Sequence, residues 1–179
     1  EAVFQLLFRV KPVALAERGY SFLHYRLRRY SGKTLVLDDG ATFRKGDLVA
    51  ELHLDNHLLY EMAQQSKSSV HLAIMMMRAM EQMMPKVAEM FANDPAFRDV
   101  KGFYGITMIN RGAKQFGFTI ADLEPGLFAF ATRRYLKLLL WVLHPDGSGR
   151  LQTRKEMLVP KALAISAEEI ARRYAGRDT

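Results

Sequence analysis

The sequence predicts an α+β domain in which a mainly antiparallel sheet of about five strands packs against two long helices. The order of the patterns is the first reason: strands come first, a long helical stretch follows and strands return, whereas a doubly wound sheet alternates the two. Composition is the second reason, because 49% hydrophobic and 25% charged residues are ordinary for a folded globular protein. The length of 179 residues and the lack of internal repeats favour a single domain over residues 1–179.

The first third of the chain has the pattern of a small antiparallel sheet. After an apolar segment in residues 1–15, which we expect to be helical, residues 20–30 alternate apolar and polar side chains as a half-buried strand does. Residues 34–37 form a second short strand, and residues 38–40, Asp-Asp-Gly, are a typical hairpin turn. The alternating segment carries Leu23, Tyr25 and Leu27 on one face and His24, Arg26 and Arg28 on the other.

A third strand is predicted over residues 48–54, which run directly into the longest helix. Its apolar side chains and the polar ones that alternate with them are Leu48, Ala50, Leu52 and Leu54, against Val49, Glu51, His53 and Asp55. Since successive residues of a strand point to opposite faces, the carboxylates and the imidazole share one face. Asp55 and Asn56 are both good helix caps, and they mark the start of the helix.

The first long helical region is predicted over residues 57–92, with a break in the polar stretch 64–69. Its apolar residues recur at steps of three and four, the spacing of one buried face: Ala73, Met76, Met80, Met83, Met84, Val87, Met90 and Phe91. We expect Pro85 to kink or end this helix. Residues 93–95, Asn-Asp-Pro, then close the region.

The second half returns to strands and adds another long helix. Strands are predicted over residues 102–110 and 118–120, on either side of one or two helical turns that Gly117 ends. The second long helix is predicted from about residue 126 to about residue 143.

The last strand and a final short helix complete the expected domain. The strand is predicted over residues 157–165, and Pro160 favours an edge position or a bulge for it. Ser166 and Glu169 have the spacing of a capping box, which predicts a helix over residues 167–174.

Composition limits the classes of function. The formal charge of +7 favours an anionic partner, such as nucleic acid, phospholipid head groups or acidic wall polymers. No cysteine is present, which excludes disulfides and thiol chemistry. No stretch reaches the roughly 20 apolar residues that cross a bilayer, so no membrane span is expected. The chain begins Glu-Ala-Val, without a Met, which fits a domain excised from a longer protein or the loss of a leader.

Polar groups around the third strand form the candidate ligand site, which comprises His24, Arg26, Glu51, His53, Asp55 and Asn56. If the two alternating strands are neighbours, these side chains share a face, and the methionine-rich helix closes a pocket there for an anionic or hydroxylated ligand. The structural alternative is cross-strand pairing of opposite charges, which stabilises a sheet without binding a ligand. The soft methionine side chains leave a lipid ligand as another alternative, beside a helix that is simply buried on most sides.

A metal site is the sharpest catalytic hypothesis. His53 and His57 are spaced i, i+4, and with a carboxylate from Asp39 or Asp55 they make the two-histidine, one-acid set of a catalytic zinc site. The acidic turn and the histidine pair are similar to motifs of polysaccharide deacetylases, but the Thr-Phe before the acidic pair and the Ser or Thr inside the histidine motif are missing. The structural alternative uses His53 at a strand end and Asp55 as a helix cap.

Nucleic acid is a further alternative partner. Basic residues gather around the first hairpins together with two tyrosines that could stack on bases: Arg26, Arg28, Arg29, Lys33, Arg44, Lys45, Tyr25 and Tyr30. No helix-turn-helix or RNA-recognition signature accompanies them, so nucleic acid is not the favoured partner. The sequence also lacks a Gly-x-Ser-x-Gly elbow, a P-loop and a Gly-x-Gly-x-x-Gly motif, and no cofactor is expected.

Several short motifs together point to a family. They are Arg29-Tyr30-x-Gly32, Leu37-x-Asp39-Gly40, Lys45-Gly46-Asp47 and Glu51-Leu52-His53-Leu54-Asp55-Asn56, followed by Gly105-Ile106-Thr107, Gly112-Ala113, Pro160, Ser166 and Tyr174. With these motifs, over most of its length, the chain resembles the YkoP-like domain of bacteria. That domain occurs alone and attached to polysaccharide deacetylases, so the resemblance implies a bacterial protein with a role near the cell envelope, and it leaves open whether the protein is cytoplasmic or associated with the envelope. It implies no catalytic residues.

We therefore expect a non-catalytic ligand-binding or accessory module linked to cell-envelope polysaccharide metabolism. Its expected ligand is a glycan, a lipid or another small molecule, and its expected partner is an attached or neighbouring polysaccharide deacetylase. The alternatives are a metal-dependent, deacetylase-like hydrolase that uses His53 and His57, and a nucleic-acid-binding protein.

Overall fold

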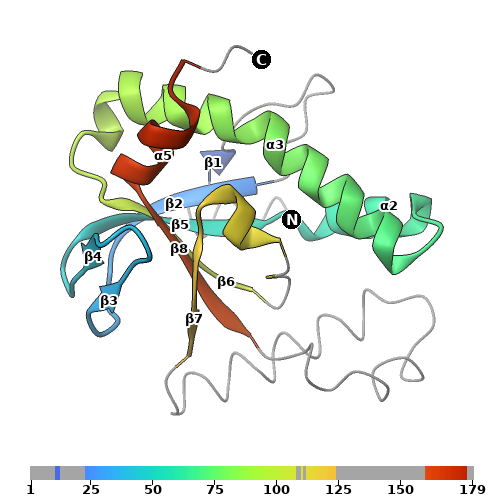
Figure 1. Cartoon of the computed structure of the whole chain (residues 1–179), viewed down its shortest axis with the longest axis horizontal. Coiled ribbons are helices and arrows are strands. Elements are labelled where there is room, and N and C mark those ends of the chain that lie inside the picture. Colours follow the sequence, from blue (N-terminus) through green and yellow to red (C-terminus); the bar gives the residue numbers. More distant parts are fainter. Residues whose placement is uncertain (1–10, 13–22, 108–109, 111, 124–159, 177–179) are drawn as a thin grey trace.

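The computed structural model describes residues 11–12, 23–107, 110, 112–123 and 160–176. Over these residues the chain has an α+β fold, in which a mixed sheet is covered by helices on one face (Figure 1). Residues 1–10 of the first apolar segment and the second long helix, expected at about 126–143, lie outside the described residues. Residues 11–12 belong to the segment that we expected to be helical, and there the prediction was wrong, because they pair with a neighbouring strand as the short strand β1 (Lys11–Pro12).

The main sheet has six strands in the order β1-β2-β5-β6-β8-β7. Their bounds are β1 Lys11–Pro12, β2 Leu23–Arg29, β5 Leu48–Leu54, β6 Gly102–Thr107, β7 Thr119–Asp122 and β8 Lys161–Ser166. β5 and β6 run parallel, and the other neighbours are antiparallel. The sheet is therefore mixed, which corrects the expected mainly antiparallel one. The helices between β5 and β6 return the chain to the end where β5 began, and such a crossover makes two strands parallel.

A hairpin between β2 and β5 forms a separate two-stranded sheet, with strands β3 (Leu35–Val36) and β4 (Thr42–Phe43). The predicted turn at residues 38–40 is confirmed, and Gly40 adopts the left-handed conformation there, with φ +88°. The hairpin reaches the main sheet, because the Asp38 N–H donates a hydrogen bond to Thr119 Oγ1 of β7 at 2.7 Å.

The described helices are α2 (Asn56–Gln65), α3 (Ser69–Asn93) and α5 (Ala167–Tyr174), with short 3-10 turns η1 (Pro95–Phe97) and η2 (Ala113–Phe116). The predicted break between α2 and α3 is confirmed, and Ser68 caps α3 by accepting a hydrogen bond from the His71 N–H at 3.1 Å. Pro85 does not end α3, which continues to Asn93. In the described part of the chain, no helix is both long and apolar enough to span a membrane.

The last strand lies inside the sheet and not at its edge. β8 pairs with β6 on one side and with β7 on the other. The predicted edge position was therefore wrong. Pro160 directly precedes the first residue of β8, so its missing N–H removes no hydrogen bond from the ladder.

Two clusters of buried side chains stabilise the two faces of the sheet. The larger one joins β2, β5 and β6 to α3 and α5, with Tyr25, Ala50, Met84, Val87, Phe103 and Ile170 among its members. The smaller one lies under the hairpin on the other face and comprises Tyr30, Leu37, Phe43, Val49 and Ala164. The sheet is thus buried on both faces near the hairpin, and polar side chains occupy the rest of that second face on β2 and β5.

Candidate ligand-binding site

The candidate site starts from the pairing of β2 and β5. Their antiparallel register puts His24 opposite His53 and Arg26 opposite Glu51. Residues directly opposite one another share a face, so four of the predicted ligand residues lie side by side. The parallel pairing of β5 with β6 adds Tyr104 next to Glu51. Ligand binding by this polar face stays a prediction.

Glu51 is the centre of the cluster. Its carboxylate accepts hydrogen bonds from Arg26 Nη2 at 2.6 Å and from Arg28 Nη1 at 2.9 Å, and His53 Nε2 lies 3.5 Å from it. The Glu51 side chain is 15% exposed, whereas the Arg26 and Arg28 side chains are 29% and 37% exposed. One largely buried carboxylate therefore holds two guanidinium groups whose outer edges reach solvent. This is also the cross-strand ion pairing of the structural alternative.

The electrostatic environment keeps Glu51 ionised. Burial alone would raise its pKa, but hydrogen bonds from His53 and Arg26 and the charge of Arg28 together lower the pKa to about 2. The pKa of Tyr104, which lies beside Glu51, is shifted in the opposite direction. Burial, the neighbouring Tyr30 and the charge of Glu51 raise the pKa of Tyr104 to about 12. Near neutral pH the cluster thus contains an ionised carboxylate next to a neutral phenol.

The end of β5 carries a second pair of groups. His24 Nδ1 lies 3.9 Å from Asp55 Oδ2, and Asp55 Oδ1 accepts a hydrogen bond from the Leu58 N–H at 3.0 Å. Asp55 is therefore a cap of α2, as its position in the sequence predicts. The side chains of Asn56 and His57 lie outside the described part of the structure, so the role predicted for Asn56 stays a prediction.

The methionine-rich helix does not wall this cluster. Met84 packs in the larger core with Tyr25 and Ala50, on the apolar face of β2 and β5. Glu51 follows Ala50 in the strand and points to the opposite face. The expected recess between the polar groups and α3 was therefore wrong, because burial of apolar area requires the methionines to cover the apolar face.

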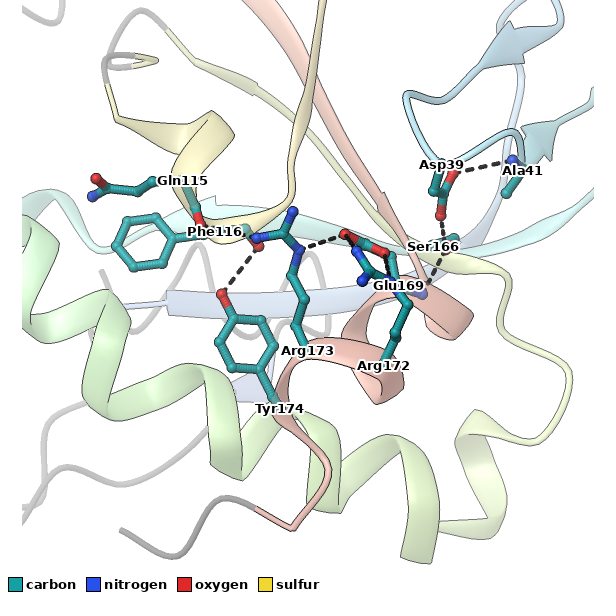
Figure 2. A network of polar contacts seen from close by, with 9 residues as sticks. All are labelled: Asp39, Ala41, Gln115, Phe116, Ser166, Glu169, Arg172, Arg173 and Tyr174. Atoms are coloured by element: carbon teal, nitrogen blue, oxygen red, sulfur yellow. Dashed lines mark hydrogen bonds and ion pairs between the residues drawn. The ribbon is translucent and has the colours of Figure 1, made fainter.

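The proposed set of metal ligands is tested only in part, because the side chain of His57 lies outside the described residues. No group of three or more His, Asp, Glu or Cys side chains among the described residues has an arrangement that could hold a metal ion. Asp39 accepts hydrogen bonds from Ser166 Oγ and from the Ala41 N–H (Figure 2). Ser166 pairs with Gly102 at the start of β6, whereas His53 lies near the end of β5, to which β6 runs parallel. Asp39 is thus at the other end of the sheet from His53.

The two tyrosines proposed to stack on bases are buried. Tyr25 and Tyr30 are 6% and 7% exposed, and each packs edge-to-face on another ring, of Phe97 at 5.2 Å and of Tyr104 at 5.1 Å between centroids. Neither ring is available to a base, so this part of the nucleic-acid hypothesis was wrong. Arg29, from the same basic group, donates a hydrogen bond to a backbone carbonyl in the β4–β5 turn.

A cavity of about 480 Å³ lies at the other end of the sheet, between the hairpin and the first turns of α5. Its lining includes Asp39, Thr42, Phe43, Lys101, Glu168 and Arg172. Glu169 also belongs to the lining, and Figure 2 shows its carboxylate between Arg172 and Arg173; Arg172 donates to it twice at 2.7 Å. Sequence reasoning missed the cavity, because its residues come from three distant segments that share no local pattern.

The fold and these sites define a mixed α+β domain with a polar strand pair at one end of the sheet and a cavity at the other. The chain belongs to the YkoP domain family, whose profile matches residues 1–174. A curated relative, the "Uncharacterized protein YkoP" of Bacillus subtilis (strain 168), is 28% identical to it over 159 residues, which are 88% of this chain and 84% of the relative. No solved structure matches the chain.

Proposed function

We propose that this chain is a non-catalytic module that binds an acidic polysaccharide of the cell envelope through the polar face of β2 and β5. One observation supports this choice above the others: the guanidinium groups of Arg26 and Arg28 share the single carboxylate of Glu51. Together the three side chains carry one net positive charge on a partly exposed surface. An anionic, hydroxylated ligand complements that charge.

The arginine pair is suited to binding because it is already ordered. A guanidinium group has five N–H donors. Glu51 accepts from one nitrogen of each arginine, and Arg28 also donates from Nη2 to Ser31 Oγ at 3.0 Å and from Nε to the Arg29 carbonyl at 3.4 Å. The partly exposed guanidinium edges match carboxylate or phosphate oxygens. Since Glu51 holds both side chains in place, a ligand would bind without the full cost of immobilising them, about 0.5–1.5 kcal/mol per side chain.

The ionisation of Glu51 also favours binding over acid–base catalysis. A general acid works best with a pKa near the working pH, whereas the pKa of Glu51 is lowered to about 2. Its role in the proposal is to position the two arginines. The polysaccharide class follows from the formal charge of +7 and from the occurrence of YkoP-like domains on polysaccharide deacetylases, which remain the proposed partner.

Binding to polygalacturonate, with neutral dextran as the control polymer, tests this function. We expect wild-type protein to bind the acidic polymer alone, and to bind it more weakly as salt rises from about 50 to about 300 mM. Arg26→Gln and Arg28→Gln should each weaken binding ~10-fold, because a charge-assisted contact is lost. Arg78→Gln is the matched control, because Arg78 is an exposed residue of α3, on the other side of the sheet.

Equal effects of all three substitutions would reduce the interaction to general charge attraction and would contradict the proposed site. Failure of the wild-type protein to bind any acidic polysaccharide in a panel that includes wall teichoic acid would contradict the function itself.

Metal analysis separates the binding module from the hydrolase alternative. Protein purified without a His tag should contain no stoichiometric transition metal if the polar face is only a binding surface. A stoichiometric metal that disappears in both His53→Ala and His57→Ala would support the hydrolase and overturn the non-catalytic assignment.

A further inference from the structure

The cavity beside α5 has features of a small-molecule site that are independent of the polar face. Its volume of about 480 Å³ falls in the usual range for ligand pockets, about 300–1,000 Å³. The ring of Phe43, which is 0% exposed, belongs to its lining. The cavity lies at the hairpin end of the sheet, whereas His24 and His53 lie at the other end of β2 and β5.

The walls of the cavity are held in fixed positions. The backbone of Lys101 donates its N–H to the Leu48 carbonyl at 2.8 Å and accepts a hydrogen bond from the Ala167 N–H at 2.9 Å. Ser166 Oγ connects the hairpin to α5, since it donates to Asp39 and accepts from the Glu169 N–H at 2.9 Å (Figure 2). The Asp39 side chain and the backbone from which Lys101 and Glu168 extend are therefore fixed before a ligand binds.

The charges in the lining are only partly matched. Glu169 is matched by Arg172, whose two hydrogen bonds to it form a bidentate pair. Asp39 accepts hydrogen bonds from the Ser166 hydroxyl and the Ala41 N–H and forms no ion pair, and the charge of Arg172, which is paired with Glu169, acts on it from a longer distance. Within the described residues, Asp39, Glu168 and Lys101 form no ion pair with one another or with another side chain. Among the described residues, two carboxylates and one ammonium group of the lining are therefore without an ion pair of their own.

These groups define the chemistry of the ligand. The carboxylates favour a cation, but the described acidic groups are not arranged to hold a metal ion. An ammonium group is a larger cation with several N–H donors, and it suits carboxylates that come from two different segments of the lining. Lys101 favours a carboxylate at the other end of the same ligand.

We propose that this cavity binds a small zwitterion, an amino acid or a short peptide, with the ligand's ammonium group toward Asp39 and Glu168 and its carboxylate toward Lys101. This second site has a ligand of different class from the polysaccharide, and neither proposal depends on the other.

Three forms of one dipeptide test the proposal. Isothermal titration with alanyl-alanine should show binding, whereas N-acetyl-alanyl-alanine, which lacks the ammonium group, and alanyl-alanine amide, which lacks the carboxylate, should each bind ~10-fold more weakly. In Glu168→Gln the difference in affinity between the dipeptide and its acetylated form should become smaller. In Lys101→Gln the difference in affinity between the dipeptide and its amide should become smaller.

Controls separate this site from general charge effects and from the polar face. Glu89→Gln and Lys45→Gln make the same charge changes at exposed positions outside the cavity lining and should leave dipeptide binding unchanged. Arg26→Gln should also leave it unchanged, although it weakens polysaccharide binding. The proposal is overturned if the dipeptide does not bind, if its three forms bind equally, or if the Glu168 and Lys101 variants weaken all three forms alike.

Discussion

At the scale of single residues, Glu51 shows that the partners of a buried group, and not burial alone, decide its ionisation. Desolvation opposes the charged form of Glu51, yet the cations and the histidine around it lower the pKa to about 2. The register of β2 and β5 brings these partners together from positions 25 and 23 residues away in the chain. Alternation in the sequence predicted which side chains share the face, but it did not predict that two arginines share one carboxylate.

Replacement of this carboxylate should make stability less dependent on pH. The pKa of Glu51 is lowered from its ordinary 4.5 to about 2, so the ionised group stabilises the fold above pH 4.5, and this contribution is lost as the pH falls toward 2. We expect Glu51→Gln to cost on the order of 3 kcal/mol in the free energy of unfolding at pH 7, and less than half of that at pH 3.

Urea unfolding of the wild type and of Glu51→Gln at both pH values measures this difference. Glu89→Gln, at an exposed position of α3, is the control and should change the free energy of unfolding only slightly at either pH. A cost of Glu51→Gln that stays the same at pH 7 and pH 3 would show that the carboxylate is not selectively stabilised in its ionised form.

At the scale of elements, local signals predicted where most strands and helices begin. The turn at residues 38–40, the break before Ser69 and the cap at Ser166 all depend on neighbours within four residues, and the structure confirms each of them. The position of β8 within the sheet depends on distant strands instead, and there the prediction from Pro160 failed.

Two serine caps should differ in their contribution to stability. Ser68 and Ser166 each accept a hydrogen bond from a helix N–H, but Ser166 is 1% exposed and also donates to Asp39. We expect Ser68→Ala to lower the free energy of unfolding by about 1 kcal/mol, which is the usual effect of losing a helix cap. Ser166→Ala should cost about 2 kcal/mol, because the hydrogen bond to the hairpin carboxylate is lost as well.

Thermal and urea unfolding of both variants measure these costs. Asp39→Ala should destabilise the fold less when Ser166 is already alanine than it does in the wild type, since both substitutions remove the Ser166–Asp39 hydrogen bond and only the hydrogen bond from the Ala41 N–H is then left to lose. Equal costs for the two serine substitutions would mean that the contact between the hairpin and α5 adds nothing to stability.

At the scale of the whole molecule, Gly102 marks the point where the hairpin meets the main sheet. A Cβ added there would lie 2.1 Å from the Ile165 carbonyl oxygen and 2.9 Å from Phe43 Cζ, and Gly102 has φ +151°. The close approach of two strands and the aromatic ring of the hairpin therefore requires a residue without a side chain.

Alanine at this position should destabilise the fold far more than alanine in an open turn. We expect Gly102→Ala to lower the free energy of unfolding by more than about 3 kcal/mol, or to prevent folding, because the backbone atoms of Ile165 and Ser166 must move. Gly40→Ala is the control: φ is +88° there and nothing lies within 4 Å of the added Cβ, so only the cost of the left-handed conformation remains, about 1–2 kcal/mol. Circular dichroism during urea unfolding compares the two variants, and similar costs would contradict the described packing.

The sequence by itself determined the α+β class, the approximate places of most of the described strands and helices, and the polar face of β2 and β5, because these features follow from local periodicity and capping chemistry. Only the tertiary structure decided that β5 and β6 are parallel, that α3 covers the face opposite Glu51, and that Asp39, Lys101 and Glu168 line one cavity. Those features are contacts between distant segments, which arise when each apolar surface finds the one that buries it, and no local pattern encodes which surfaces will meet.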